Sequence, residues 1–399
     1  MKIGIFTECY KPTMNGVVVS IDTFKTELEK RGHEYYIFAP NTKKYEDVES
    51  RVYRLPSISV PGQGYYPVAI PFASPGIIDI VQKNKIDLIH CQHLFSMGGL
   101  GLSIGKKLNI PVVYTYHTLI AEYTHYVPLI QSLVKKYIIY RSRVFSNSCD
   151  QIVTPSNPMK RILMKYGVKT PIAVIPTGIN IGNFKRVDSK IFRLKHNIPE
   201  DVKILLFVGR LAEEKNISFL LKAFKKVIEK TPAHLVLIGG GSDVPRYKKE
   251  ARNLGINRSV TFTGYLSKPE TDKIFGMADI FAFASITETQ GIVIAEAMAA
   301  GAIPVAVNKM GPTDVINSGE NGLLTDLTLS DFSSKISYLI KNPALLKNMS
   351  LEAQKTATLF SSQATADKME KLYTQVLEKG ARVREKNILH SRSHSLSEV

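Results

Sequence analysis

The sequence predicts an α/β protein built from two parallel-sheet domains. Its 399 residues are enough for two domains with separate hydrophobic cores. Short apolar runs and helical patterns alternate along both halves, as expected for βαβ units in a parallel sheet. We expect an N-terminal domain over residues 1–178, a C-terminal domain over 182–360, a helix over 361–380 and a disordered polar tail over 381–399.

The composition argues against several classes of protein. The three cysteines, Cys9, Cys91 and Cys149, are far apart and odd in number, which indicates a reducing compartment and no disulfide framework. No apolar run approaches the roughly 18 residues that a membrane span needs, and the N-terminal run is too short for a signal peptide. No cluster has metal-ligand spacing, so no metal site is expected.

The net charge is +17, and most of the excess lies in the N-terminal half. Residues 1–186 hold 23 lysines and arginines against 12 acidic residues, whereas the remainder holds 29 against 23. This imbalance indicates that the first half binds an anionic partner. The candidates are a lipid surface, a nucleic acid and a phosphorylated substrate.

The chain opens with a βαβ unit, in which strands over Lys2–Phe6 and Tyr35–Ala39 flank a helix over residues 17–31. Ligands bind at the C-terminal ends of parallel strands, so the loop before Gly16 is a ligand loop by position. The loop lacks G-x-G-x-x-G, which disfavours a dinucleotide-dependent oxidoreductase. Gly16 either lets a diphosphate approach the backbone or is an N-cap glycine.

Histidines end two later strands of this half. His117 directly follows the strand predicted over residues 111–116 and should face the ligand edge of the sheet, although a histidine bonded to backbone is the alternative. His90 and His93 lie at an equivalent strand end, where they are further candidates to border the pocket, and their spacing indicates a metal only weakly.

Two segments are candidates for contact with an acceptor or a membrane. Residues 54–75 are rich in Pro, Gly and Tyr and predict irregular structure, whose tyrosines either touch an acceptor or anchor the loop. Residues 123–149 carry basic and aromatic side chains but no acid. A basic amphipathic helix suits an anionic membrane surface, and a surface helix with its apolar side in the core is the alternative. The residues assigned to this contact are Tyr65, Tyr66, Tyr123, Tyr126, Lys135, Lys136, Arg141 and Arg143. On a helical wheel one apolar face comprises Leu133, Tyr137, Tyr140 and Val144.

The C-terminal half places cations and glycines after successive strands. Gly209 and Arg210 follow the strand predicted over residues 203–208, and Lys215 precedes the next helix. Two cations at a strand end suit the binding of a diphosphate, because Arg can donate two parallel hydrogen bonds and Lys supplies a compact positive charge. The alternative is that both residues are ordinary surface charges. The next strand, predicted over His234–Gly239, ends on the candidate ligand contact Gly239, and the strand after it is followed by the candidates Tyr265 and Leu266.

Two carboxylates lie eight residues apart in the stretch SITETQGIVIAEAMAAGAIP, residues 285–304. Glu288 lies in a loop after the buried strand Asp279–Ala284, and Glu296 lies inside the apolar helix that follows. The structural alternative is that Glu288 is an acid stabilised by the helix dipole and that Glu296 is a buried glutamate hydrogen-bonded to backbone. The functional interpretation is a ligand cradle, with backbone N–H groups for phosphate and carboxylates for sugar hydroxyls.

ETQGIVIAE resembles the E-x7-E motif of the retaining glycosyltransferases of family 4. The resemblance extends over about residues 1–378, through Gly16, His117 and the G-R…E-K arrangement of Arg210 and Lys215. It implies the α/β GT-B fold, with two Rossmann-like domains facing a cleft and a late helix that crosses back to the first domain. It also implies metal-independent transfer of a hexose from a nucleotide sugar with retained configuration.

The resemblance also implies a role for each matching residue. Glu288 approaches the donor sugar, Glu296 binds the ribose, and His117 lies beside the sugar within the acceptor pocket. Arg210 and Lys215 grip the diphosphate. The implied catalytic residues are His117, Glu288, Arg210 and Lys215. The implied donor-binding residues are Gly16, Gly209, Arg210, Lys215, Gly239, Tyr265, Leu266, Glu288, Thr289, Gln290, Gly291, Ile292 and Glu296.

Three shorter motifs, EYTHYV, SMG near Met97 and TETQG near Gln290, resemble the family branch that glucosylates diacylglycerol. This implies UDP-glucose as donor, diacylglycerol as acceptor, and peripheral attachment to an anionic membrane on its cytoplasmic side, with no nucleic acid. GDP-mannose with a phosphatidylinositol-type lipid is the neighbouring alternative. A soluble acceptor, a GT-B sugar-nucleotide epimerase and a non-enzymatic basic binding protein are the remaining ones.

Overall fold

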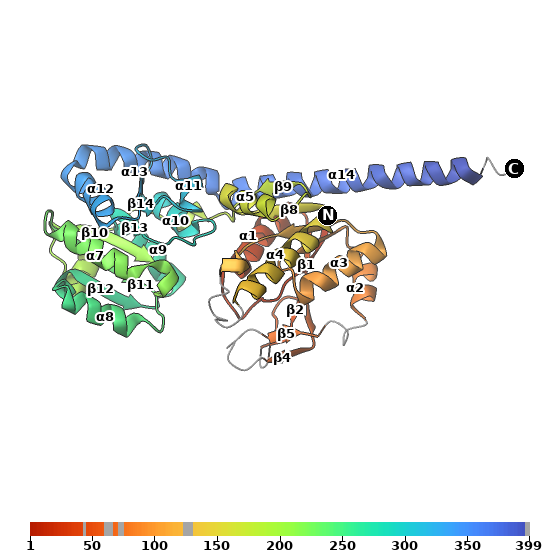
Figure 1. The fold of residues 1–399 in the computed structure, drawn as a ribbon, viewed down its shortest axis with the longest axis horizontal. Helices are drawn as coiled ribbons and strands as arrows, with labels where there is room; N and C mark the ends of the chain where they lie inside the picture. The colour runs from red at the N-terminus through yellow and green to blue at the C-terminus, as the bar shows by residue number, and fades with distance from the viewer. Residues whose placement is uncertain (43–44, 60–66, 71–75, 123–130, 396–399) are drawn as a thin grey trace. The chain divides into compact units, whose positions relative to one another are not determined.

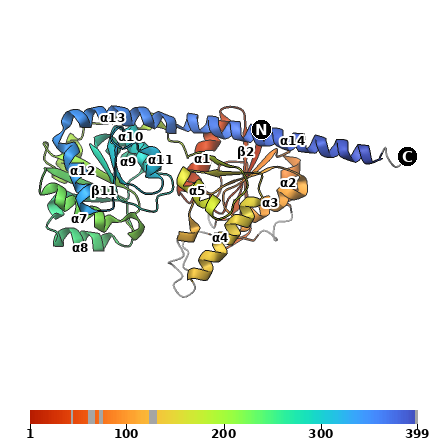
Figure 2. The same cartoon turned by 45° about the horizontal axis from the view of Figure 1, so that its top comes forward.

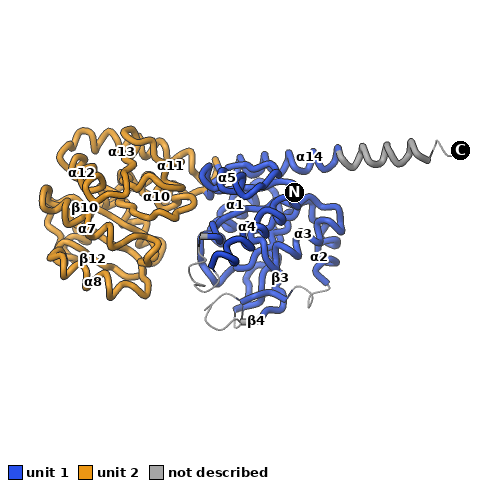
Figure 3. The backbone as a smooth tube through the Cα atoms, viewed as in Figure 1, with its two compact units in different colours: residues 1–177, 365–399 blue, residues 178–364 orange. Residues whose placement is uncertain are grey.

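The structure, a computed structural model, describes residues 1–42, 45–59, 67–70, 76–122 and 131–395, with side chains up to residue 382 except those of Ser59 and Glu122. Two compact units divide the chain (Figures 1 and 3). Unit 1 comprises residues 1–177 and 365–399, and unit 2 comprises residues 178–364.

Unit 1 is organised around a seven-stranded sheet whose neighbouring strands are all parallel. The strand order β3-β2-β1-β6-β7-β8-β9 reverses beside β1, and ligands bind such sheets outside the carboxyl ends of the strands at this point. The strands are β1 (Lys2–Phe6), β2 (Glu34–Pro40), β3 (Val52–Leu55), β6 (Leu88–Cys91), β7 (Val112–Thr115), β8 (Gln151–Thr154) and β9 (Ile172–Val174). The helices are α1 (Gly16–Glu29), α2 (Ile77–Lys83), α3 (Ser96–Leu108), α4 (Gln131–Asn147), α5 (Asn157–Lys165) and most of α14 (Ser362–Ser395), and a separate antiparallel pair is formed by β4 (Ser57–Ser59) and β5 (Pro67–Ala69).

Unit 2 repeats the same architecture with six parallel strands in the order β12-β11-β10-β13-β14-β15. The strands are β10 (Lys203–Val208), β11 (Ala233–Ile238), β12 (Val260–Gly264), β13 (Ile280–Phe283), β14 (Ile303–Val307) and β15 (Leu323–Thr325). The helices are α6 (Lys190–His196), α7 (Ile217–Ile228), α8 (Val244–Asn253), α9 (Lys268–Met277), α10 (Ile292–Ala299), α11 (Pro312–Val315), α12 (Leu329–Lys341) and α13 (Pro343–Ala357).

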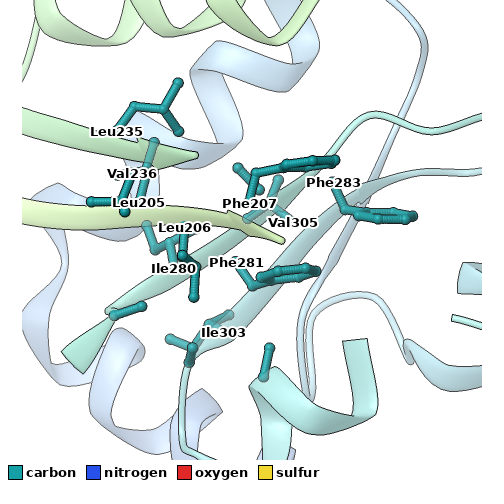
Figure 4. Packing of buried hydrophobic residues seen from close by; sticks show 14 of the residues in the cluster. Leu205, Leu206, Phe207, Leu235, Val236, Ile280, Phe281, Phe283, Ile303 and Val305 are labelled. Atoms are coloured by element: carbon teal, nitrogen blue, oxygen red, sulfur yellow. The ribbon is translucent and has the colours of Figure 1, made fainter. Parts of the chain in front are cut away.

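The core of unit 2 explains why its strands are continuous apolar runs. A parallel sheet covered on both faces buries successive side chains on either side, so alternation with polar residues is not needed. Phe207 of β10 and Phe283 of β13 stack with their ring centroids 5.9 Å apart, and Phe281 packs beside them (Figure 4). Because β10 and β13 also pair in the sheet, the carboxyl ends of these two central strands lie next to each other.

Helix α14 starts in unit 2 and completes the core of unit 1, as the family resemblance implied. Met369 and Tyr373 are about 1% exposed and pack against residues of β1 and α1. The Tyr373 hydroxyl lies 2.6 Å from His90 Nδ1, and His90 Nε2 lies 2.7 Å from the Thr115 hydroxyl. Where the sequence led us to expect disorder from residue 381, α14 continues to Ser395, and no proline interrupts the helix over this stretch.

We predict that Tyr373→Phe lowers the free energy of unfolding by about 1–3 kcal/mol, because it removes a buried hydroxyl partner of His90. Urea unfolding followed by circular dichroism measures this change. Tyr338→Phe is the matched control, since Tyr338 is 55% exposed and should leave the urea midpoint unchanged. Equal midpoints for the two variants would contradict the predicted contribution of the Tyr373–His90 contact.

Candidate functional site

The residues predicted to bind a donor in unit 2 gather at one edge of its sheet. Arg210 follows β10, Gly239 follows β11, Tyr265 follows β12, and the loop 284–291 follows β13. These strands are parallel and consecutive in the sheet, in the order β12-β11-β10-β13, so their carboxyl ends meet at the same edge. This edge is therefore the candidate site of unit 2.

An ion pair between Lys215 and Glu288 lies at the centre of this edge. Lys215 Nζ donates to Glu288 Oε2 at 2.9 Å, and both side chains are about four-fifths buried. The backbone N–H of Gly291 donates to Glu288 Oε1 at 3.2 Å. Burial raises the pKa of Glu288, but Lys215 and the N–H groups of Gly291 and Gln290 outweigh it, so the net pKa lies below the ordinary value. Glu288 is thus a largely buried carboxylate held in its ionised form.

The turn into α10 fixes the orientation of Glu288. Gly291 adopts a φ of 87°, which favours glycine, and immediately precedes Ile292, the first residue of α10. Thr289 is half-buried and Gln290 is buried. The Gly311 N–H donates to the Glu288 backbone carbonyl at 2.8 Å, so the loop after β14 secures the loop after β13. The positive end of α10 consequently lies beside the Lys215–Glu288 pair.

Arg210 occupies a different position from Lys215. Its side chain is 60% exposed and pairs with Glu214 Oε1, four residues along. The two predicted cations therefore lie at the same strand end, but each has its own carboxylate. Arg210 is the more accessible of the two.

The glycines of this edge are explained mainly by the fold. Gly239 has a φ of 127°, and a Cβ there would lie 2.0 Å from the Gly209 carbonyl oxygen. Gly209 itself has a φ of 154°. The ring of Tyr265, a residue 78% exposed, lies so close to Gly240 that a Cβ on that glycine would come within 2.3 Å of it. Tyr265 thus presents an aromatic face at the edge, whereas Leu266 packs partly into the core.

Glu296 does not share the loop of Glu288 but projects from the second turn of α10. It is 9% exposed, and its Oε1 lies 3.0 Å from Nζ of Lys268, the first residue of α9. Burial raises the pKa of Glu296, the charge of Lys268 lowers it, and the balance remains above the ordinary value. Lys268 was not predicted from the sequence, and no motif marks it.

Unit 1 has its own polar cluster at the carboxyl ends of β1, β6 and β7. His117 Nε2 lies 2.7 Å from Oε1 of buried Gln92, and the Glu8 N–H donates to His93 Nδ1 at 3.1 Å. Burial lowers the pKa of His117 to about 3 and that of His93 to about 4. Both rings are therefore neutral at physiological pH. Gln92, which fixes the ring of His117, was missed by the sequence reasoning because a lone buried Gln carries no signal.

Two other predictions for unit 1 are revised by the structure. His90 does not border this edge, since it is 3% exposed and bonded to Tyr373 and Thr115. The N-cap of α1 is Asn15, whose Oδ1 accepts the N–H groups of Val17 and Val18, so the N-cap alternative for Gly16 is wrong. A Cβ on Gly16 would meet nothing within 4 Å, so packing does not require glycine there.

Helix α4 lies on the surface of unit 1 (Figure 2), and its two faces differ in burial. Its buried residues are Ile138, Ser142, Phe145 and Ser146. The opposite face exposes Leu133 by 67%, Tyr137 by 58%, Tyr140 by 53% and Val144 by 37%. The predicted apolar face is therefore exposed and is not core.

The basic residues of α4 differ in accessibility. Lys136 and Arg143 are exposed, and the Arg143 guanidinium lies 5.7 Å from the centroid of the Tyr140 ring. Lys135 and Arg141 are half-buried, and Arg141 Nε is buried with no hydrogen-bond partner among the residues that the structure describes. The predicted contacts Tyr65, Tyr66, Tyr123 and Tyr126 lie outside the described residues.

Comparisons with known proteins identify the family. Residues 14–183 match the family model Glycosyltransferase Family 4, and residues 188–356 match the model Glycosyl transferases group 1. The chain is 38% identical over 321 residues to the alpha-monoglucosyldiacylglycerol synthase of Streptococcus pneumoniae, an alignment that covers 77% of this chain and 71% of that protein. This chain belongs to the family 4 glycosyltransferases.

A second relative has the same named activity as the first, and solved structures share the fold of this chain. The alpha-monoglucosyldiacylglycerol synthase of Acholeplasma laidlawii is 29% identical over 393 residues, covering 95% of this glycosyltransferase and 98% of that protein. A sucrose-phosphate synthase from Thermosynechococcus elongatus superposes with a TM-score of 0.76 at 21% identity, covering 95% of this chain and 99% of that one. HepE from Anabaena, solved with UDP, superposes with a TM-score of 0.75 at 19% identity, and the superposition covers 94% of this chain and 100% of HepE. These likenesses confirm the predicted GT-B fold.

Membrane-spanning helices and metal-binding clusters are both absent from the part of the chain that the structure describes. No helix in that part of the chain is both long and apolar enough to cross a bilayer. The same residues contain no group of three or more His, Cys, Asp or Glu side chains arranged to hold a metal ion.

Proposed function

We propose that this glycosyltransferase transfers glucose from UDP-glucose to diacylglycerol and retains the anomeric configuration, giving an alpha-glycolipid. The observation that carries the proposal is the Lys215–Glu288 pair at the start of α10, in a chain 38% identical to an alpha-monoglucosyldiacylglycerol synthase. HepE, a fold neighbour, has been solved with UDP and glucose, and this supports uridine as the base.

The charges in unit 2 suit the departure of a nucleoside diphosphate. When the bond between the sugar C1 and the diphosphate oxygen breaks, negative charge gathers on the diphosphate. Lys215, Arg210 and the positive end of α10 are fixed cations or dipoles at one strand edge and would stabilise that charge without rearranging. Glu288, ionised and buried beside them, would stabilise the positive charge that develops on the sugar ring.

The acceptor proton needs a destination, and His117 is a poor one. Its pKa of about 3 leaves the ring neutral but too weakly basic to take a proton near pH 7. We assign the proton to an oxygen of the leaving diphosphate, as the new bond between the acceptor oxygen and C1 forms on the same face of the sugar. His117 would then orient a sugar hydroxyl by a hydrogen bond.

The surface of α4 supports a lipid acceptor within a membrane. Leu133, Tyr137 and Tyr140 are apolar groups exposed beside the cations Lys136 and Arg143. Such a face suits the boundary between headgroups and acyl chains, and each cation near an anionic surface contributes about 1 kcal/mol. We therefore propose peripheral attachment to the cytoplasmic side of an anionic membrane.

The direct test is a screen of UDP-glucose, UDP-galactose and GDP-mannose against diacylglycerol and phosphatidylinositol in mixed vesicles. Mass spectrometry identifies the lipid product, and NMR of the anomeric proton reports its configuration. We expect hexosyl-diacylglycerol of alpha configuration from UDP-glucose. A mannosyl lipid formed from GDP-mannose, or transfer only to water-soluble acceptors, would overturn the proposed substrates.

We predict that Lys215→Ala and Glu288→Ala each lower kcat/KM by about 100-fold or more, because each removes a charge that acts on the transition state. Steady-state kinetics with the donor varied gives the values, and circular dichroism checks that both variants fold. Lys222→Ala is the matched control, since Lys222 is more than half exposed and pairs only loosely with Glu250. Near-normal turnover in both site variants would remove them from the catalytic assignment.

We further predict that replacing Leu133 and Tyr137 by serine weakens binding to anionic vesicles and slows transfer to diacylglycerol, while KM for the donor is unchanged. Vesicle flotation at rising salt measures the binding, which should fall as salt screens the charges. The matched control replaces Ile191 and Leu194 of α6, which are 82% and 70% exposed, by serine. Equal flotation of the two double variants, or salt-independent binding to neutral vesicles, would contradict a role for α4.

A further inference from the structure

Lys268 connects two buried carboxylates of unit 2. Its Nζ lies 3.0 Å from Glu296 Oε1 and forms a short ion pair with Asp272, which is 6% exposed. The same ammonium lies 4.7 Å from the centroid of the Phe184 ring. Lys268 thus has three partners from three segments of the chain, although its side chain is more than half exposed.

The start of α9 holds Lys268 in this position. Ser267 and Glu270 form a capping box, in which the Glu270 carboxylate accepts the Ser267 N–H at 2.9 Å. Lys268 is the first residue after this cap, and Asp272 follows one helical turn later. The backbone of Lys268 is therefore fixed, and its ammonium is directed towards α10 by the pair with Asp272.

The contact between Lys268 and Glu296 affects how well the Glu296 carboxyl group can accept hydrogen bonds from a ligand. Burial favours the neutral carboxylic acid, and the charge of Lys268 opposes it. A protonated carboxyl loses acceptor capacity that a carboxylate keeps. Lys268 binds Oε1 of Glu296, and among the described residues no partner is recorded for Oε2. One oxygen is held by the protein and the other is left for a donor group.

We propose that Lys268 is a positioning residue for the nucleotide, which holds the Glu296 carboxylate ionised and oriented so that Oε2 accepts hydrogen bonds from the ribose hydroxyls of a nucleoside diphosphate. The inference rests on the proposed function and on the ribose-binding role that the family resemblance implies for Glu296. It adds that the affinity for the ribose depends on a residue of α9 that does not itself touch the nucleotide.

The test compares nucleotides that differ only in the ribose hydroxyls. Isothermal titration calorimetry gives the Kd of UDP and of 2′,3′-dideoxy-UDP for the full chain, for Lys268→Met, and for Lys268→Arg. Lys273→Met is the matched control, because Lys273 is an exposed residue of the same helix. We expect the wild type to favour UDP about tenfold or more, as hydrogen bonds to a charged group would. Lys268→Met should lose most of that preference, whereas Lys268→Arg and Lys273→Met should keep it.

Kinetics give a second readout. Lys268→Met should raise KM for the donor while kcat at saturating donor changes little, because the residue acts on binding of the ribose and not on the reacting bond. Glu296→Gln provides a variant that keeps the size of the side chain. The double variant with Lys268→Met should bind UDP no more weakly than Glu296→Gln alone, since the two residues act through one contact.

Three results would overturn the inference. One is an equal loss of affinity for UDP and dideoxy-UDP in Lys268→Met, which would indicate a structural role only. Another is a wild type that does not distinguish the two nucleotides. The third is a double variant whose loss is the sum of the single losses. If GDP binds and UDP does not, the proposed donor is wrong, and the same comparison with GDP and 2′,3′-dideoxy-GDP then decides the role of Lys268 independently.

Discussion

A carboxylate that is removed from water needs an opposite charge or hydrogen bonds to stabilise it, and Glu288 is such a carboxylate in the candidate site of unit 2. Lys215 supplies the charge, and the turn at Gly291 supplies an N–H group. The Gly311 N–H donates to the backbone carbonyl of Glu288, and the Ser285 hydroxyl donates to the Glu214 carbonyl at 3.2 Å. Loops that follow three different strands are thereby joined around one ionised group, which makes the edge rigid before any ligand arrives.

Unit 1 differs from unit 2 in that the titratable groups buried at its sheet edge are neutral. His117 and His93 have pKa values of about 3 and 4, and His90 also has a pKa of about 3. Burial is the first cause in each case, and the three rings lie near enough for the other two to disfavour a charge on His117. The two units therefore contribute different chemistry: fixed charges in unit 2, and neutral hydrogen-bonding rings in unit 1.

The sequence was sufficient to predict the two parallel-sheet units and the order of their strands along the chain, because apolar runs and the turns between them are local signals. It also predicted the loop of Glu288, since a charged residue in an apolar surrounding demands an explanation. It could not predict Lys268 or Gln92, whose roles depend on side chains 28 and 25 residues away. Arg210 and Lys215 were expected to act as a pair, but sequence spacing could not show that each has its own carboxylate. The continuation of α14 beyond Gly380 was also missed, because a polar composition is common to exposed helices and to disordered tails.

The packing of α14 has a consequence for how the protein is made. Met369, Tyr373 and Val376 belong to the same core as Ile3 and Ile5, although more than 360 residues separate them along the chain. A growing chain leaves the ribosome from its N-terminus, so unit 1 cannot complete its core until nearly the whole polypeptide has been synthesised. Unit 2, formed by the continuous residues 178–364, has no such dependence. Vectorial synthesis would therefore favour completion of unit 2 first, with apolar surface of unit 1 left uncovered in the nascent chain until the last helix emerges.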